Sequence, residues 1–382
     1  MVEVTATDEW RIIVPLRFNR ANHGQLPNID CPEIDDRGYI KGNRPGVWGD
    51  TTVRGPSFGV LAGDAVRVRV VRDDIDGDVP LAATSSDPAV LTIRNANGLI
   101  APDGELWVEG QASGTAAIDI HLGDARGPII GQADVRVHSR LRVALTPHLV
   151  RIDSTTTNGV VPAMPIDQMV RRLRAIWRPC GIDFNVRATV NDTIRLPSDQ
   201  ANFLAAAGRN DTIAVLGLQR RRLALPAAQR DQSINWYIIQ EFRPRPTGAV
   251  TVGRGISRRT ADEWGINDTG IIVAAQANGV ARDSEFTART LAHEVGHFFR
   301  LEHVQRRNSS DAVRDTYGRR QLMYPLSGLS GGTGGVALPR FDNVGYGDGV
   351  RGCLLTMKNH NHHSTDGECA TARNAIHSNN WS

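Results

Sequence analysis

The chain has 382 residues, of which 40% are hydrophobic and 22% charged, a balance that excludes a largely disordered protein. Its net charge is only +3, and its densest basic run, Arg220–Arg222, has no interleaved aromatic residues, so we expect no nucleic-acid partner. No segment approaches the roughly 18 consecutive apolar residues of a membrane span. The length exceeds what one hydrophobic core usually fills, which indicates more than one domain.

Residues 1–140 have the pattern of a β-sandwich domain. Arg67–Arg72 and Ala116–Leu122 alternate polar and apolar residues, which is typical of half-buried strands. Short strands at this spacing predict two packed sheets. Ser85–Leu91 and Val108–Ala116 resemble segments of bacterial immunoglobulin-like domains. That resemblance implies binding to a surface or to a delivery partner.

One acidic segment in this region resembles a metal-binding loop. Asp74–Asp78 carries alternating carboxylates, as the start of a calcium loop does. The twelfth position, which holds a bidentate glutamate in such loops, is Ser85. We therefore favour a plain hairpin turn, and a structural Ca²⁺ ion is the alternative.

From about residue 141 the pattern changes to alternating strands and helices. Apolar residues of Pro165–Trp177 form one helical stripe, and the leading proline suits the first helical turn. This alternation predicts an α+β domain over residues 141–330. Residues 331–382 are glycine-rich and have no sustained periodicity, so we expect an extended tail or a surface subdomain that packs on the preceding domain. Strands are predicted at Leu141–Leu145, Ile182–Val186, Thr212–Leu216, Asn235–Gln240 and Gly270–Ala274.

The segment Thr290–His303 carries the chemistry. His293 and His297 are four residues apart, so on a helix their imidazoles can reach one metal ion. Glu294 is rotated about 100° from the first histidine, where it can reach a water without binding the metal. The third predicted ligand is His303.

The helix that carries this motif should begin near Ser284, whose hydroxyl can cap it. Its buried side is predicted to comprise Leu291, Val295, Phe298 and Phe299. A straight helix would place His303 about 80° away from the metal face and more than two turns further on. The chain must therefore turn back sharply after Phe299.

The motif resembles that of the metzincin zinc peptidases, and Met323 lies 20 residues after His303, as in their methionine turn. Leu322–Pro325, which includes Tyr324 and Pro325, is most similar to the matrixin branch. The resemblance implies a mixed twisted sheet, an active-site helix and Met323 as an apolar floor beneath the imidazoles. It also implies that a strand before the helix, for which we take Gly270–Ala274, holds the substrate.

Three positions depart from the metzincin pattern. Arg300 replaces the glycine of the turn, which costs about 1 kcal/mol or more in a left-handed conformation. Val304 and Ser327 stand where matrixins have a serine and a tyrosine. The assignment to a branch and the side-chain preference of the pocket therefore stay open.

The four cysteines allow more than one interpretation. Cys353 and Cys369 could form a disulfide, or a zinc site with the histidines between them. Arg178–Gly181 resembles the inhibitory cysteine segment of matrixin propeptides. We favour a buried structural role for Cys180, because this segment follows a helix inside the domain.

These observations predict a zinc-dependent endopeptidase acting on proteins or peptides. Three imidazoles leave one Zn²⁺ ion an open position for a water, and Glu294 takes the proton of that water and passes it to the leaving amine. The alternative is a binding or adhesive protein with a non-catalytic zinc site. The sequence starts without a secretory signal, so the protein stays inside the cell, leaves it by another route, or has had its signal removed. We favour export by another route, which would suit an effector or toxin.

Overall fold

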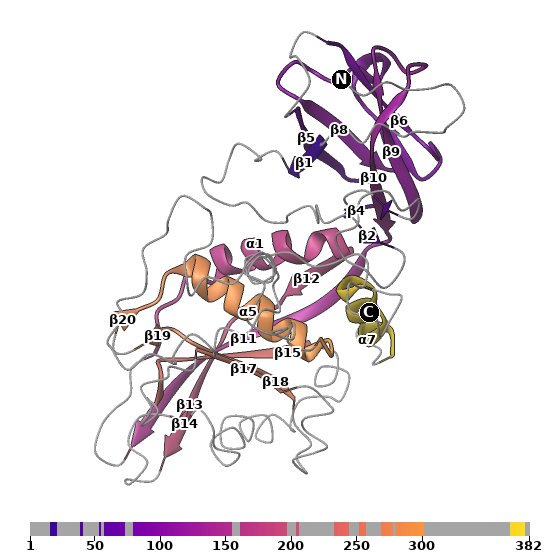
Figure 1. Cartoon of the computed structure of the whole chain (residues 1–382). Coiled ribbons are helices and arrows are strands. Elements are labelled where there is room, and N and C mark those ends of the chain that lie inside the picture. Colours follow the sequence, from indigo (N-terminus) through magenta and orange to yellow (C-terminus); the bar gives the residue numbers. More distant parts are fainter. Residues whose placement is uncertain are drawn as a thin grey trace. The chain divides into compact units, whose positions relative to one another are not determined.

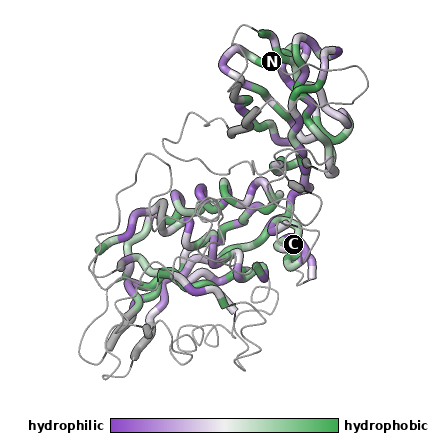
Figure 2. Tube along the Cα trace, in the orientation of Figure 1, coloured by the Kyte–Doolittle hydropathy of each residue, from purple (hydrophilic) through white to green (hydrophobic). Residues whose placement is uncertain are grey.

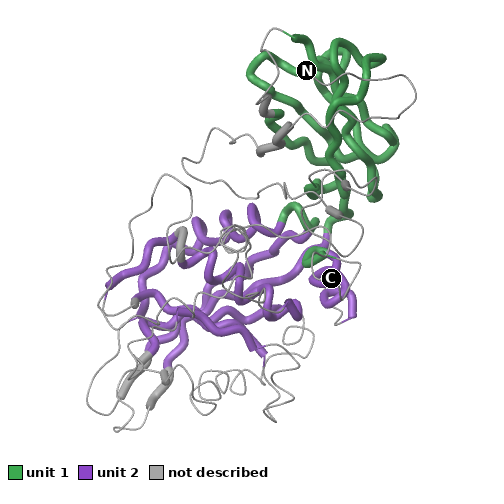
Figure 3. Tube along the Cα trace, in the orientation of Figure 1, with its two compact units in different colours: residues 1–140, 178–181, 356–369 green, residues 141–177, 182–355, 370–382 purple. Residues whose placement is uncertain are grey.

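The computed structural model describes residues 16–20, 39–40, 53–54, 57–72, 79–154, 161–196, 204–205, 233–243, 252–256, 269–277, 280–301 and 367–378. The chain divides into two compact units (Figure 3). Unit 1 comprises Met1–Arg140 with two later segments, Arg178–Gly181 and Thr356–Cys369; unit 2 comprises the remainder. The first break falls after Arg140, and the two later segments of unit 1 have no counterpart in the sequence analysis.

Unit 1 consists mainly of two four-stranded sheets. One has the order β1-β5-β8-β7, and the other has the order β4-β10-β9-β6, in which β4 and β10 are parallel. A two-stranded ladder, β2 (Tyr39–Ile40) with β3 (Val53–Arg54), and the short helix η1 (Ala96–Gly98) are also present. The strands of the two sheets are β1 (Leu16–Arg20), β4 (Ser57–Leu61), β5 (Ala65–Arg72), β6 (Leu81–Ser85), β7 (Leu91–Ile93), β8 (Glu105–Gly110), β9 (Gly114–Leu122) and β10 (Ile129–His138).

The predicted alternation produces the core of this unit. In β8, Leu106 and Val108 are fully buried, while the alternate residues Glu105, Trp107 and Glu109 are partly exposed. Figure 2 shows the same alternation of hydrophilic and hydrophobic residues along the strands. Inward side chains from both sheets form one hydrophobic cluster between them. Asp74–Asp78 lies outside the described residues.

Unit 2 is built on a mixed six-stranded sheet. Its order is β12-β11-β15-β18-β17, and β13 pairs with the second half of β11. Every pairing is parallel except that of β17, which runs antiparallel to β18. The strands are β11 (Leu141–Ser154), β12 (Ile182–Val186), β13 (Val190–Leu196), β15 (Ser233–Ile239), β17 (Gly253–Ile256) and β18 (Gly270–Ala274).

Two helices, α1 (Ile166–Trp177) and α5 (Ser284–Phe298), lie on the sheet and pack against each other (Figure 1). The apolar stripe of α1 is buried as its periodicity predicts, including Met169, Leu173 and Ile176. The coarse α+β prediction is therefore confirmed. No helix within the described ranges has both the length and the apolar character needed to cross a bilayer.

The smaller elements complete the described structure. Thr212–Leu216 lies outside the described residues. Within the C-terminal extension, Glu368–Ser378 forms the helix α7, which was not predicted from the sequence. Others are η2 (Arg178–Cys180) and the short strands β14 (Leu204–Ala205), β16 (Phe242–Arg243), β19 (Gln276–Ala277) and β20 (Val280–Ala281).

Candidate metal centre

The helix α5 is held in place by its apolar side. Leu291, Val295, Phe298 and Phe299 are buried, as predicted. Phe299 meets the ring of Trp177 on α1 edge-to-face at 5.4 Å between ring centroids. The end of α5 is therefore fixed against the end of α1, close to the histidines of the motif.

The start of α5 agrees with the prediction, because Ser284 is the first residue of the helix. Its hydroxyl donates to Oε1 of Gln168 on α1 at 3.2 Å. The N–H and the hydroxyl of Thr287 both donate to the backbone oxygen of Asp283, at 3.0 and 2.8 Å. The hydroxyl of Ser284 therefore links the start of α5 to the neighbouring helix α1.

The chain leaves the helix direction at Arg300. Its N–H bonds to the His297 oxygen at 3.0 Å, and the Leu301 N–H bonds to the Gly296 oxygen at 2.9 Å. This pair of bonds is the Schellman motif, which needs a left-handed residue at its centre. Arg300 supplies that conformation with a φ of 65°. The predicted break of the helix at this point is confirmed, although the residue is not glycine.

The same turn orients His297. Its Nδ1 lies 2.9 Å from the backbone oxygen of Leu301. A carbonyl oxygen can only accept a hydrogen bond, so Nδ1 carries the proton and donates it. In the neutral ring Nε2 therefore keeps a lone pair, as a metal ligand requires.

His293 lies one helical turn before His297. The two ring centroids are 4.7 Å apart and the ring planes are at 87° to each other. His293 is 1% exposed and His297 is partly buried. Two imidazoles on one helix face, next to a turn that fixes one of them, could hold a divalent metal ion.

Glu294 is almost completely buried, with 4% exposure, beside β17. Its Oε1 would lie 2.8 Å from a Cβ added to Gly253. The carboxylate thus lies between the helix and the antiparallel strand. The pattern Gly253-Arg254-Gly255 is the part of the sequence that could have indicated this contact, because alternate glycines in a strand often mark a close approach of another backbone.

The resemblance assigns substrate binding to the strand Gly270–Ala274, and this assignment is wrong. It forms β18, which pairs with β15 on one side and with β17 on the other, and all its residues are buried. A strand with both edges paired has no free edge for a peptide. Among the described strands, β17 is the one at this edge of the sheet.

The remaining predicted site residues lie outside the described ranges: His303, Met323, Tyr324 and Pro325. Within the described ranges, no three His, Cys, Asp or Glu side chains lie together as a metal site. The structure brings His293 and His297 together and places the Glu294 carboxylate against β17, and the third ligand stays a prediction.

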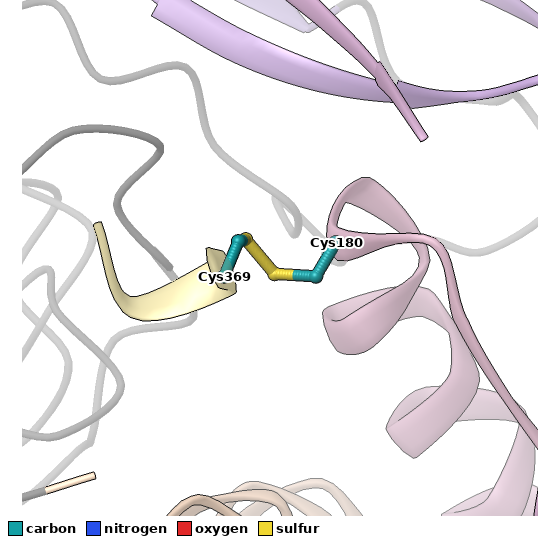
Figure 4. Close-up of a disulfide and its surroundings, with 2 residues drawn as sticks. All are labelled: Cys180 and Cys369. Carbon is teal, nitrogen blue, oxygen red and sulfur yellow. A yellow bond between two sulfur atoms is a disulfide. The ribbon is translucent and has the colours of Figure 1, made fainter. Parts of the chain in front are cut away.

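The disulfide pairing differs from the one considered from the sequence. Cys180 bonds to Cys369, across a sequence separation of 189 residues (Figure 4). This pairing rules out both a Cys353–Cys369 bridge and a zinc site that uses the Cys369 thiolate. The predicted burial of Cys180 is confirmed.

No model of a known protein family matches the chain, and no curated protein matches it either. Among solved structures, domains 4 and 5 of the S-layer protein SbsC match with 22% identity and a TM-score of 0.16, over 21% of this chain and 45% of that one. Domains 5–6 of SbsC match with 21% identity and a TM-score of 0.18, over 23% of this chain and 43% of that one.

A cohesin module from a Clostridium perfringens ATCC13124 family 33 glycoside hydrolase matches with 12% identity and a TM-score of 0.12, over 21% of this chain and 90% of the module. The chain spans less than half of the SbsC structures described above. Matches at these TM-scores carry no argument about the fold or the function of either unit.

Proposed function

We propose that this protein is a zinc-dependent endopeptidase of the metzincin type, with His293, His297 and His303 as ligands and Glu294 as general base. The turn at Arg300 carries the proposal. It ends α5 directly after the HExxH motif and holds Nδ1 of His297, leaving Nε2 as the ligand atom. A helix continuing past residue 300 would be incompatible with a third ligand at His303.

The residues present fit a catalytic zinc ion. Neutral imidazoles are the donor set of such sites, and a buried carboxylate that does not bind the metal can act as the base beside them. When bound, zinc would polarise the scissile carbonyl and acidify the attacking water. Glu294 would accept the proton of that water at its carboxylate and return it to the leaving amine.

We further propose that the substrate is an extended peptide lying along β17. This strand is at the edge of the described sheet, and its Gly253 and Gly255 face α5 beside Glu294. Main-chain hydrogen bonds to an edge strand bind a peptide without strict dependence on its side chains. This arrangement favours endopeptidase activity on unfolded or extended substrates.

The proposal includes export from the cell. The disulfide between Cys180 and Cys369 favours a protein that works in an oxidising compartment, where such bonds persist. An effector or toxin that acts after delivery would fit both the disulfide and the peptidase chemistry. Unit 1, an ordered β-sandwich, is the part that we expect to bind a surface or a delivery partner.

The test combines metal analysis with cleavage assays on the purified protein, using casein and a peptide library. Wild type should contain one zinc ion per chain and cleave, and Glu294→Ala should keep the zinc while losing at least about 10²-fold in activity. His297→Ala should lose both. Equal cleavage by wild type and Glu294→Ala would remove the enzyme assignment, and zinc without cleavage would favour the binding or adhesive alternative.

A further inference from the structure

Two glycines of β17 allow this strand to lie directly against Glu294. A Cβ on Gly253 would lie 2.6 Å from Cγ2 of Thr290, and 2.8 Å from Oε1 and 2.9 Å from Cγ of the glutamate. A Cβ on Gly255 would lie 2.7 Å from the backbone oxygen of Glu294 and 3.3 Å from its Oε2. Carbon atoms do not approach this closely without displacement, so β17 holds its position only because both residues lack a side chain.

The spacing of the two glycines matches the geometry of a strand. Side chains alternate between the faces, so residues 253 and 255 share one face and Arg254 belongs to the other. The register of β17 on β18 is regular across all three, with Arg254 opposite Ile272. The bare face of β17 is therefore turned toward α5, which agrees with the contacts to Glu294 and His297.

One guanidinium links the helix to the end of β18 and to the residue before β17. Arg282 donates from one nitrogen to the Ala274 oxygen at the end of β18, at 3.1 Å, and more distantly to the Val252 oxygen, at 3.5 Å. Its other nitrogen donates to Oγ1 of Thr290 at 2.8 Å. Thr290 is one helical turn before Glu294, so Arg282 joins the two surfaces between which the carboxylate lies.

We propose that Gly253, Gly255 and Arg282 are positioning residues for the Glu294 carboxylate. This inference rests on the proposed peptidase function. The two glycines set where the carboxylate can lie, and Arg282 sets the separation of β17 from α5. A general base must stay within hydrogen-bond reach of its proton, and a displacement of about 1 Å can cost about 10²-fold in rate.

The first test is the variant Gly253→Ala, which adds one methyl group beside Oε1 of Glu294. We expect kcat to fall by about 10²-fold while KM and the bound zinc stay at wild-type values. A loss of zinc together with activity would overturn the inference, because the glycine would then support the fold of the site as a whole. Unchanged kcat would overturn it as well.

The second test adds no atoms to the contact. Arg282→Lys keeps the charge but loses the planar fork that serves Thr290 and the strand carbonyls together, so we expect a fall in kcat of about tenfold with zinc retained. The matched control is Arg171→Lys, at an exposed position of α1, which should keep full activity. Equal activities of the two variants would contradict the role of Arg282.

A double-mutant cycle separates this inference from the proposed function. The loss of unfolding free energy caused by Gly253→Ala is measured in wild type and in Glu294→Ala, where the opposing carboxylate is absent. A smaller loss in the second background would demonstrate the contact even if the protein cleaves no peptide. Equal losses would show that the methyl group does not act through Glu294, and the inference would fail while the peptidase assignment stands.

Discussion

A single arginine in a left-handed conformation ends the helix of the candidate metal centre. Arg300 has a φ of 65°, and a non-glycine residue pays about 1–2 kcal/mol for this region because its Cβ crowds the backbone. The two hydrogen bonds of the turn and the buried side chains of Phe299 and Leu301 hold it there. Local strain at a site of this kind is maintained by the surrounding packing.

Replacing this arginine by glycine should therefore stabilise the protein. Relief of the strain is partly offset by the greater freedom of glycine in the unfolded chain, so we expect a gain of up to about 1 kcal/mol for Arg300→Gly. Urea denaturation measures it. Arg300→Ala is the control, because alanine keeps the strain and should show no gain. A loss of stability in Arg300→Gly would show that the side chain makes a necessary contact.

At the level of single residues, the sequence predicts what depends on local geometry. The placement of His293 and His297 on one helix follows from their spacing, and the need for a break follows from the position of His303. The role of Ser284 could not be predicted. Its hydroxyl bonds to Gln168, which is 116 positions earlier in the chain. Capping preferences describe local helix ends and do not predict a tertiary partner of this kind.

At the scale of elements, the contact between the ends of α1 and α5 supports the metal centre. Trp177 and Phe299 are both fully buried, and their rings meet edge-to-face. Phe299 directly precedes Arg300, so this contact fixes the point at which the chain turns. Any cavity on the α1 side should loosen the turn that orients His297.

Trp177→Ala should destabilise unit 2 by about 3–5 kcal/mol, the usual cost of removing a large buried aromatic side chain. Trp177→Phe keeps an aromatic contact and should cost less. Chemical denaturation measures both losses of stability. Zinc titration of the two variants measures the effect on the metal centre. Similar stabilities of the alanine and phenylalanine variants would show that the edge-to-face contact contributes little.

Strand pairing marks where prediction from the sequence stops. The run Gly270–Ala274 is correctly predicted as a strand with the same bounds, because a short apolar run of this kind has a strong local preference. Its pairing partners, β15 and β17, are set by tertiary structure and cannot be deduced from the run itself. The edge strand carries two glycines in four residues, which weakens its own strand signal.

At the scale of the whole molecule, binding of zinc should be measurable as stability. If His293, His297 and His303 hold the ion, free zinc at 100 times its dissociation constant adds about 2.7 kcal/mol to the unfolding free energy. A chelator should remove this gain from wild type. His303→Ala should show no response to zinc or chelator, and a full response in that variant would exclude His303 as a ligand.

The organisation of the whole chain is predicted in part. The alternation in unit 1 is strong enough to predict a sandwich, because it repeats over several strands with one buried face. The helix α7 was missed because its buried stripe consists largely of small residues, with Cys369, Ala372 and Ala375 three apart. Such a stripe has little hydropathy contrast with its surroundings. Disulfide pairing cannot be deduced from spacing alone.

The disulfide between Cys180 and Cys369 should contribute strongly to stability, because it closes a loop with a sequence separation of 189 residues. Chain-entropy arguments give about 4–5 kcal/mol for loops longer than 100 residues. Cys369→Ser should lose this amount in urea denaturation under oxidising conditions. Cys180→Ser breaks the same bond and should lose the same amount, and the double variant should lose no more than either single variant. Peptide mapping without reduction should recover the Cys180–Cys369 peptide, and a Cys353–Cys369 peptide in its place would contradict the pairing.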